Sequence, residues 1–304
     1  MNDTERILIR YVCEGDIKKA QQQARILLGQ MNAKKDSDFS QNMLRKLDAK
    51  PVNLIELPYN LRELLIAEDV TDFPEKRFIL RAGEADVVRR TLSSLKASER
   101  LSELGISYLP ALMLHGQSGG GKTMLARYIA HKADLPFVYV RFSSIVSSYL
   151  GSTQANIAKV FEYAKNSPCV LCFDEIDAVG MARGQKNDVG EMNRIVIALM
   201  QEMDQLPNNI IVVGTTNRFD RLDPALIRRF TITHEVLPMS SEDVTALAKK
   251  FFSYSGVQLE GWFSKWRDTN FRGDEPASAV VEKCTRLIVE KIMQEQEEDL
   301  RLEA

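Results

Sequence analysis

The sequence predicts an α/β fold in which helices cover both faces of a mostly parallel sheet. Short apolar runs typical of strands alternate with amphipathic segments typical of helices between about residues 110 and 238. A glycine-rich turn at residues 116–123 lies between the first of these runs and the helix after it. A later run, residues 170–173, is continuously apolar, as expected of a strand buried on both faces.

The glycine-rich turn has the spacing of a phosphate-binding loop, G-x-x-x-x-G-K-T. Its glycines let the backbone wrap around a polyphosphate, and the following helix presents its positive N-terminal end to the same anion. Lys122 is expected to reach the terminal phosphates and the Thr123 hydroxyl to bind magnesium. A flexible loop without a ligand is the alternative, which the strand–turn–helix context argues against. The predicted cofactor contacts here are Gly116, Gln117, Ser118, Gly119, Gly120, Gly121, Lys122, Thr123 and Met124.

Residues 1–75 are expected to form an N-terminal helical region and a linker. Apolar residues such as Ile7, Val12 and Leu27 recur at roughly helical spacing among charged ones, and Pro51 then breaks the pattern. A helical hairpin of this kind would either dock a partner or cap the core. The composition does not separate these two roles.

Residues 76–238 are expected to form the αβ core and residues 239–304 a C-terminal helical lid. The lid is predicted to begin at the N-cap Ser240, ahead of Glu242 and Asp243. Strands are predicted at residues 111–115, 137–142, 170–173, 210–215 and 234–237. Helices are predicted near residues 85–104, 122–133, 154–166, 189–205 and 223–229.

Composition narrows the function classes. Lys+Arg 40 against Asp+Glu 42 gives a net charge of −2, so nucleic acid is not expected as the main partner. No apolar run approaches the length of a membrane span, and the first residues lack a secretory pattern, so neither membrane insertion nor export is expected. Cys169 and Cys172 lie in an apolar strand pattern, and we expect them to pack in the core of a protein of the reducing cytoplasm.

Polar residues follow two of the buried apolar runs. Asp174, at a strand tip beside a phosphate loop, would hold hydrated magnesium, and the adjacent Glu175 would activate the attacking water. Asn217 follows the run that ends near residue 215. It would either hydrogen-bond the γ-phosphate or cap the turn that begins at Arg218.

Arg228 and Arg229 follow a short predicted helix. Paired arginines are usually surface charge. They would be catalytic if they entered the ATP site of a neighbouring subunit, because an arginine stabilises charge on the transferring phosphate.

Tyr149, Leu150 and Gly151 form an aromatic–aliphatic–glycine triplet in a predicted loop. Such a triplet is most often a core plug. The functional alternative is a mobile hydrophobic finger that grips a substrate chain by burying apolar area.

In order and spacing these motifs resemble those of AAA ATPases, over roughly residues 80–290. The resemblance is to the branch with proteasomal, membrane-protease, and severing or ESCRT-disassembling members. The motifs that carry it are the phosphate loop, Phe173-Asp174-Glu175-Ile176-Asp177, Gly214-Thr215-Thr216-Asn217-Arg218 and Leu222-Asp223-Pro224-Ala225-Leu226-Ile227-Arg228-Arg229-Phe230.

The resemblance implies ATP and Mg²⁺ as cofactors and a ring or spiral hexamer with ATP between subunits. It also implies roles for individual residues, including a nucleotide contact from Gly273 at the start of a lid helix. There the following Asp274-Glu275-Pro276 departs from the family pattern. The implied roles are magnesium and water activation by Asp174 and Glu175, γ-phosphate sensing by Asn217, trans-acting fingers at Arg228 and Arg229, and a pore loop at Tyr149, Leu150 and Gly151.

The leading functional expectation is a cytoplasmic ATPase that remodels, unfolds or disassembles protein substrates by threading them through a hexameric pore. The alternative is an ATP-dependent switch that holds or releases a partner effector, a protease or nuclease, through the N-terminal helices. DNA loading has less support, because the sequence has neither a zinc motif nor a basic face.

Overall fold

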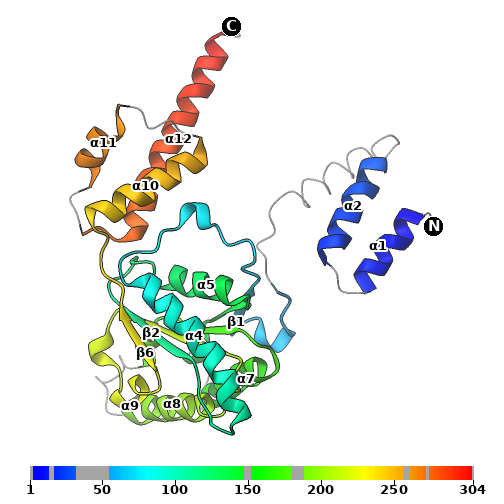
Figure 1. Ribbon diagram of the computed structural model, residues 1–304, viewed down its shortest axis with the longest axis vertical. Helices are drawn as coiled ribbons and strands as arrows, with labels where there is room; N and C mark the ends of the chain where they lie inside the picture. The colour runs from blue at the N-terminus through cyan, green and yellow to red at the C-terminus, as the bar shows by residue number, and fades with distance from the viewer. Residues whose placement is uncertain are drawn as a thin grey trace. The chain divides into compact units, whose positions relative to one another are not determined.

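The computed structural model describes residues 3–13, 17–31, 55–146, 152–179, 188–256, 261–271 and 274–302. The chain divides into two compact units, Met1–Leu54 and Ile55–Ala304. In the first unit, helices α1 (Asp3–Cys13) and α2 (Ile17–Met31) pack against each other (Figure 1). Ile9 and Val12 on α1 are 50% and 63% exposed, so this helix presents apolar surface.

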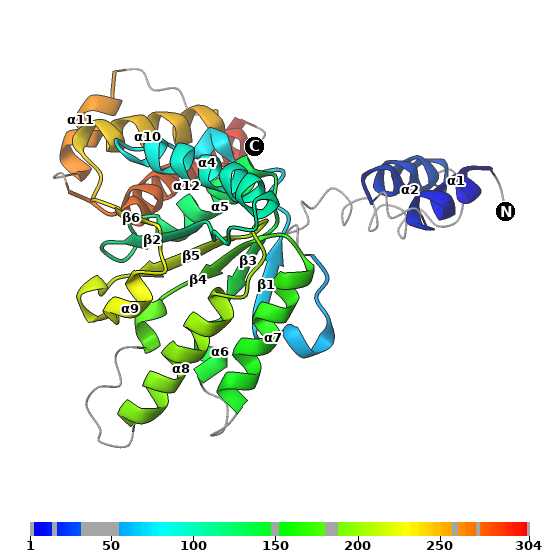
Figure 2. The same ribbon diagram turned by 60° about the horizontal axis from the view of Figure 1, so that its bottom comes forward.

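The second unit is built on a sheet whose described strands have the order β1-β3-β4-β5-β2-β6 (Figure 2). β1 pairs antiparallel with β3, and all other neighbours are parallel. Every residue of β4 and β5 is buried, as expected of central strands covered on both faces. The strands are β1 (Leu65–Glu68), β2 (Ala111–His115), β3 (Phe137–Val140), β4 (Val170–Phe173), β5 (Ile211–Thr216) and β6 (Ile232–Glu235).

The sheet differs from the prediction at β1, at the end of β3 and at β6. β3 ends at Val140 rather than at Phe142, because Phe142 begins α6. β1 lies after Pro51, in the part of residues 1–75 that was expected to be a linker, and its Leu65 and Ala67 are buried where it pairs with β3. A run this short is not identified by its periodicity alone. β6 begins at Ile232 rather than at His234, since its register with β2 places Ile232 opposite Leu112.

Helices cover both faces of the sheet, as predicted (Figure 2). One face is covered by α4 (Glu84–Glu103) and α5 (Lys122–Ala133). The other face is covered by α6 (Phe142–Val146), α7 (Ser152–Asn166), α8 (Asp188–Met203) and α9 (Pro224–Ile227). Short 3₁₀ helices complete the connections: η1 (Tyr59–Leu61), η2 (Glu75–Arg77), η3 (Ile176–Val179) and η4 (Phe219–Arg221).

Cys169 and Cys172 contribute to the apolar clusters on opposite faces of the sheet. Both are buried free thiols. Burial raises the pKa of Cys169 to about 12 and the pKa of Cys172 well above its usual value. The prediction that they pack in the core is confirmed.

The C-terminal helices form a smaller body with its own apolar core (Figure 1). This lid consists of α10 (Ser241–Ser255), α11 (Phe263–Asn270) and α12 (Ala277–Leu302). Its cluster includes Val244, Phe252 and Cys284, and both tryptophans of the chain, Trp262 and Trp266, pack against it. Although α12 has 26 residues, no helix in the described part of the chain is long and apolar enough to cross a membrane.

Ser240 caps α10, as predicted, and forms a capping box. Its hydroxyl accepts a hydrogen bond from the N–H of Asp243 at 3.1 Å, and the Asp243 carboxylate accepts from the N–H of Ser240 at 3.0 Å. Each bond satisfies a backbone donor that the first helical turn leaves without a partner.

Ser240→Ala should therefore destabilise the lid by about 1 kcal/mol, because one capping bond is lost and the reciprocal one is weakened. Urea unfolding followed by tryptophan fluorescence measures this effect, since Trp262 and Trp266 report on the lid. Ser241→Ala, one position inside the helix, is the control and should shift stability by less than about 0.5 kcal/mol. Equal effects of the two substitutions would contradict the capping role.

Candidate active site

The phosphate loop connects β2 to α5 at the C-terminal edge of the sheet. Gly116 opens it with φ at +139°, and a Cβ there would lie 2.4 Å from the Val236 carbonyl oxygen. Only glycine therefore fits between the loop and the chain leaving β6. Gly121 is the N-cap of α5, so the N-terminus of this helix faces the space that the loop encloses.

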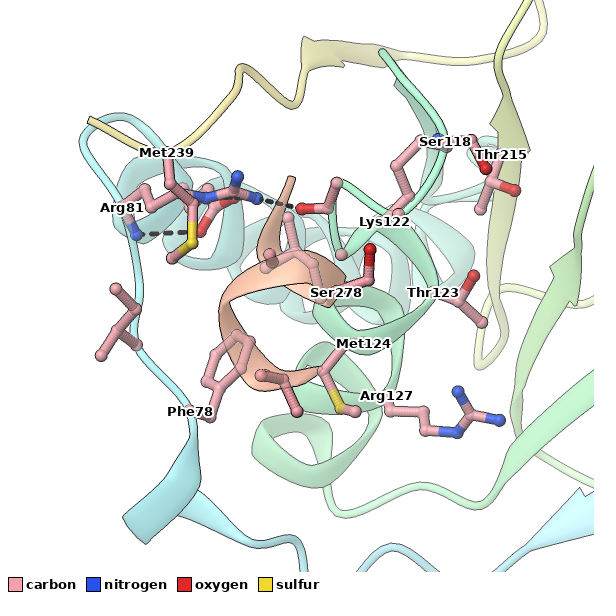
Figure 3. A pocket seen from close by; sticks show the side chains of 18 of the residues that line it. Phe78, Arg81, Ser118, Lys122, Thr123, Met124, Arg127, Thr215, Met239 and Ser278 are labelled. Atoms are coloured by element: carbon pink, nitrogen blue, oxygen red, sulfur yellow. Dashed lines mark hydrogen bonds and ion pairs between the residues drawn. The ribbon is translucent and has the colours of Figure 1, made fainter. Parts of the chain in front are cut away.

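A cavity of about 470 Å³ lies over the loop (Figure 3). Of the predicted cofactor contacts, Ser118, Gly119, Gly120, Gly121, Lys122, Thr123 and Met124 line it. Asp174 and Glu175 after β4 and Asn217 after β5 line it as well. Five segments that are far apart in the sequence thus supply one site, including residues 77–84 and the lid.

Lys122 is 7% exposed and its ammonium group is surrounded by oxygen atoms. It donates to the carbonyls of Gly116 and Gln117 at 3.0 and 2.9 Å and to Oδ1 of Asn217 at 2.5 Å. Burial lowers the pKa of Lys122, and the carboxylates of Asp174 and Asp177 oppose that effect. Gly116 and Gln117 therefore contact the cavity lysine rather than the cavity itself.

Thr123 and Asp174 lie together at the predicted metal position. The Thr123 hydroxyl donates to Oδ2 of Asp174 at 3.1 Å, and Thr215 donates to Oδ1 of the same carboxylate. A hydroxyl and a carboxylate beside a phosphate loop are oxygen ligands of the kind that Mg²⁺ prefers. These residues fit the predicted magnesium site.

Glu175 follows Asp174 with a left-handed backbone, φ +53°, and its N–H donates to the Thr215 hydroxyl at 3.3 Å. Positive φ is uncommon for a residue other than glycine. The tip of β4 thus holds the Asp174 carboxylate and the Glu175 backbone N–H against Thr215 of β5, and both residues line the cavity.

The Asn217 side chain follows β5 and lines the cavity. The N–H of Arg218 donates to the Thr216 hydroxyl at 2.9 Å, so Thr216 serves the turn at the start of η4. The Asn217 side chain instead contacts Lys122 inside the cavity. The Asn217 side chain therefore lies at the cavity and not at the turn.

A sequence model of the ATPase family associated with various cellular activities (AAA) matches residues 112–237. The chain is 34% identical over 67% of its length to the peroxisomal ATPase pex6 of Schizosaccharomyces pombe, of which this match covers 20%. It is 34% identical over 60% of its length to the proteasome-activating nucleotidase of Methanosphaerula palustris, covering 47% of that protein. It is 26% identical over 97% of its length to the AAA family ATPase y4kL of Sinorhizobium fredii, covering 91% of it.

The chain belongs to the AAA ATPase family. The matched segment contains the phosphate loop and the strands β3, β4, β5 and β6, and the mainly parallel sheet confirms the predicted fold class. The chain spans a fifth of pex6 and about half of the nucleotidase.

Two of the predicted site residues, Arg228 and Arg229, lie outside the cavity. Arg228 is exposed, and Arg229 forms an ion pair with Asp204 at 3.2 Å and also donates to the Ala225 carbonyl. Neither arginine lines the cavity. Tyr149, Leu150, Gly151 and Gly273 lie outside the described residues.

The cavity also has an apolar wall, which was not predicted from the sequence. Phe78 and Ile79 come from the segment before α4, and Met239, Leu247 and Val281 come from the lid (Figure 3). The run Phe78-Ile79-Leu80 just before a helix was the one available signal, but nothing local relates it to the phosphate loop.

Arg127, also missed, lines the cavity from α5. It donates to both carboxylate oxygens of Glu68 on β1 at 2.7 and 2.9 Å, and this pairing raises the pKa of Arg127. The unpredicted edge strand therefore holds the helix that carries Lys122 and Thr123.

Proposed function

We propose that this chain hydrolyses ATP and uses the energy to remodel, unfold or disassemble protein substrates in the cytoplasm. One observation carries the proposal: a single cavity joins Lys122, the Thr123–Asp174 pair, Glu175 and Asn217 beside an apolar wall. The names of two relatives, a peroxisomal ATPase and a proteasome-activating nucleotidase, support a role in acting on proteins.

The apolar wall suits a nucleobase and the loop suits its phosphates. Phe78, Met239 and Val281 would bury the base, while the N–H groups of the loop and the end of α5 would bind the anion. On binding, the Lys122 ammonium would exchange oxygen partners, turning toward the terminal phosphates while Asn217 stays beside them. Thr123 and Asp174 would hold Mg²⁺, which neutralises charge on the phosphates when bound.

Glu175 is the group we propose to activate the attacking water. Glu175 directly follows the proposed metal residue Asp174, has a left-handed backbone and lines the same cavity. An ionised carboxylate accepts the proton that water loses as it attacks the γ-phosphate.

Glu175→Gln should keep nucleotide binding and lose at least about a hundredfold in kcat, since the amide retains the shape but not the basicity. Phosphate release assays give the rate, and binding of a fluorescent ATP analogue gives the affinity. Glu162→Gln, an exposed change of equal charge on α7, is the control and should leave both values unaltered. Undiminished hydrolysis by Glu175→Gln would remove this residue from the mechanism.

We further propose that Arg228 and Arg229 complete the site of a neighbouring subunit in a homo-oligomer, with a hexamer as the expected form. Their position outside the cavity of their own chain supports this arrangement, as does the exposure of Arg228. An arginine that enters from a neighbour stabilises charge on the transferring phosphate.

Replacing both arginines with glutamine should lower kcat by about a thousandfold or more. Lys122→Met should be inactive as well, but for a different reason, because it disables the cavity of its own subunit. Mixing the two inactive proteins should restore part of the activity, since an intact cavity then meets intact arginines. Steady-state ATPase assays of the mixture measure this recovery, and no recovery under conditions of subunit exchange would refute action in trans.

Two modes of action on proteins fit such an ATPase. In the first, Tyr149 and Leu150 of successive subunits grip a polypeptide and draw it through a central pore. In the second, the ATPase cycle switches a partner effector through the N-terminal unit, whose exposed Ile9 and Val12 offer apolar contact area.

Tyr149→Ala should separate these modes. Threading predicts that basal ATP hydrolysis stays within about twofold while unfolding of a fluorescent substrate protein falls by at least about tenfold, because the aromatic grip is lost. Switching of a partner predicts no loss in either assay. Full unfolding activity in Tyr149→Ala would exclude threading by this loop.

A further inference from the structure

Arg81 joins three segments that border the nucleotide cavity. Its guanidinium donates to the Gly120 carbonyl of the phosphate loop at 2.8 Å and to the Leu237 carbonyl at 2.7 Å. Its Nε donates to Glu84, which also accepts from the Arg81 backbone N–H at 2.8 Å. Figure 3 shows this side chain beside Met239, on the side of the cavity opposite Thr215.

The Arg81–Glu84 pair is almost fully buried, with side-chain exposures of 10% and 3%. Burying two charges is costly, and the cost is offset only when every donor finds an acceptor. Here the planar guanidinium reaches one carboxylate and two carbonyls, which a lysine ammonium on a flexible stem would not match. The chain thus places a buried ion pair, whose desolvation is costly, where the phosphate loop and the lid meet.

The bond to Gly120 bears on phosphate binding through the geometry of the peptide unit. The Gly120 carbonyl and the Gly121 N–H belong to one planar trans peptide, so they point in opposite directions. While Arg81 holds the carbonyl on its own side, the Gly121 N–H points away from Arg81. Backbone N–H groups of such a loop bind the phosphate.

The bond to Leu237 bears on the lid. Leu237 lies between β6 and the lid, two residues before Met239, whose N–H donates to the Glu275 carbonyl at 3.0 Å. The lid also meets the loop directly, since the Ser278 N–H donates to the Gly119 carbonyl at 3.1 Å. A Cβ on Gly119 would lie 2.2 Å from the Ser278 hydroxyl, so the two segments are in close contact.

We propose that Arg81, held by Glu84, is a positioning residue that couples the phosphate loop to the lid hinge at residues 237–239. It orients the Gly121 N–H toward a bound phosphate. Through its bond to Leu237 it also makes the conformation of the hinge depend on whether phosphate is bound in the loop. The inference rests on the proposed nucleotide binding and adds a regulatory connection to it.

The test compares Mg-ADP with adenosine as probes of Arg81→Met, using competition against a fluorescent nucleotide. The Kd for ADP should rise about tenfold or more, because the Gly121 N–H would lose its charge-assisted hydrogen bond to the phosphate. The Kd for adenosine, which has no phosphate, should stay within about twofold. Arg81→Lys keeps the ion pair with Glu84 but loses the planar guanidinium, so it should weaken ADP binding to an intermediate degree. It keeps the proposal testable if Arg81→Met does not fold. Arg89→Met is the matched control, because Arg89 forms an exposed i,i+3 pair with Asp86 on α4.

Amide hydrogen exchange at residues 237–239 provides a readout that a merely structural role would not change. At saturating ADP the hinge should exchange more slowly in the wild type and in Arg89→Met, but not in Arg81→Met. Unchanged ADP affinity in folded Arg81→Met, equal weakening of ADP and adenosine, or preserved hinge protection would each overturn the coupling. If the wild type bound neither nucleotide, the proposed function itself would fail, a result distinct from any of these.

Discussion

The structure around the phosphate loop depends on one buried ammonium group, that of Lys122. Lys122 loses its hydration at 7% exposure, and that loss is tolerable only where oxygen atoms replace the water. The carbonyls of Gly116 and Gln117 and the amide of Asn217 provide those oxygens, and the carboxylate of Asp174 provides the opposite charge. They come from the ends of β2, β4 and β5, which are adjacent parallel strands. Strand order and direction therefore make the burial of the lysine possible, because they bring these oxygens to its ammonium group.

The cavity around this lysine is shared between two bodies with separate apolar cores. The αβ core supplies the polar groups, and the lid supplies part of the apolar wall through Met239, Leu247 and Val281. At the loop the lid contacts the αβ core through Ser278, whose N–H donates to the Gly119 carbonyl. A ligand that fills such a cavity interacts with both bodies at once, so its binding free energy depends on how they are placed. A difference in affinity between two placements is what allows a ligand to shift a conformational equilibrium.

Signals that are local in the chain were interpreted correctly from the sequence. The loop spacing, the fully apolar run before Asp174 and the capping residues at Ser240 each depend on neighbours within a few positions, and the structure has β4 and the capping box where they were predicted. The strand at Leu65–Glu68 was not identified, because a four-residue strand at an edge gains its stability from β3, about seventy residues later. Its Glu68 holds Arg127 beside the cavity, so this omission also hid a residue of the site.

By itself the sequence determined the α/β class, the phosphate loop and the residues that follow β4 and β5, because turn geometry and apolar periodicity are encoded over short stretches. Only the tertiary structure decided which distant segments complete the cavity, such as those that bring Phe78 and Val281 to its apolar wall. It also decided the contact of Asn217 with Lys122 and the bonds of Arg81 to Gly120 and Leu237. It also decided that Arg228 and Arg229 stay out of their own cavity. These relations join residues tens to more than a hundred positions apart. They depend on the packing of whole helices on the sheet, which no local pattern specifies.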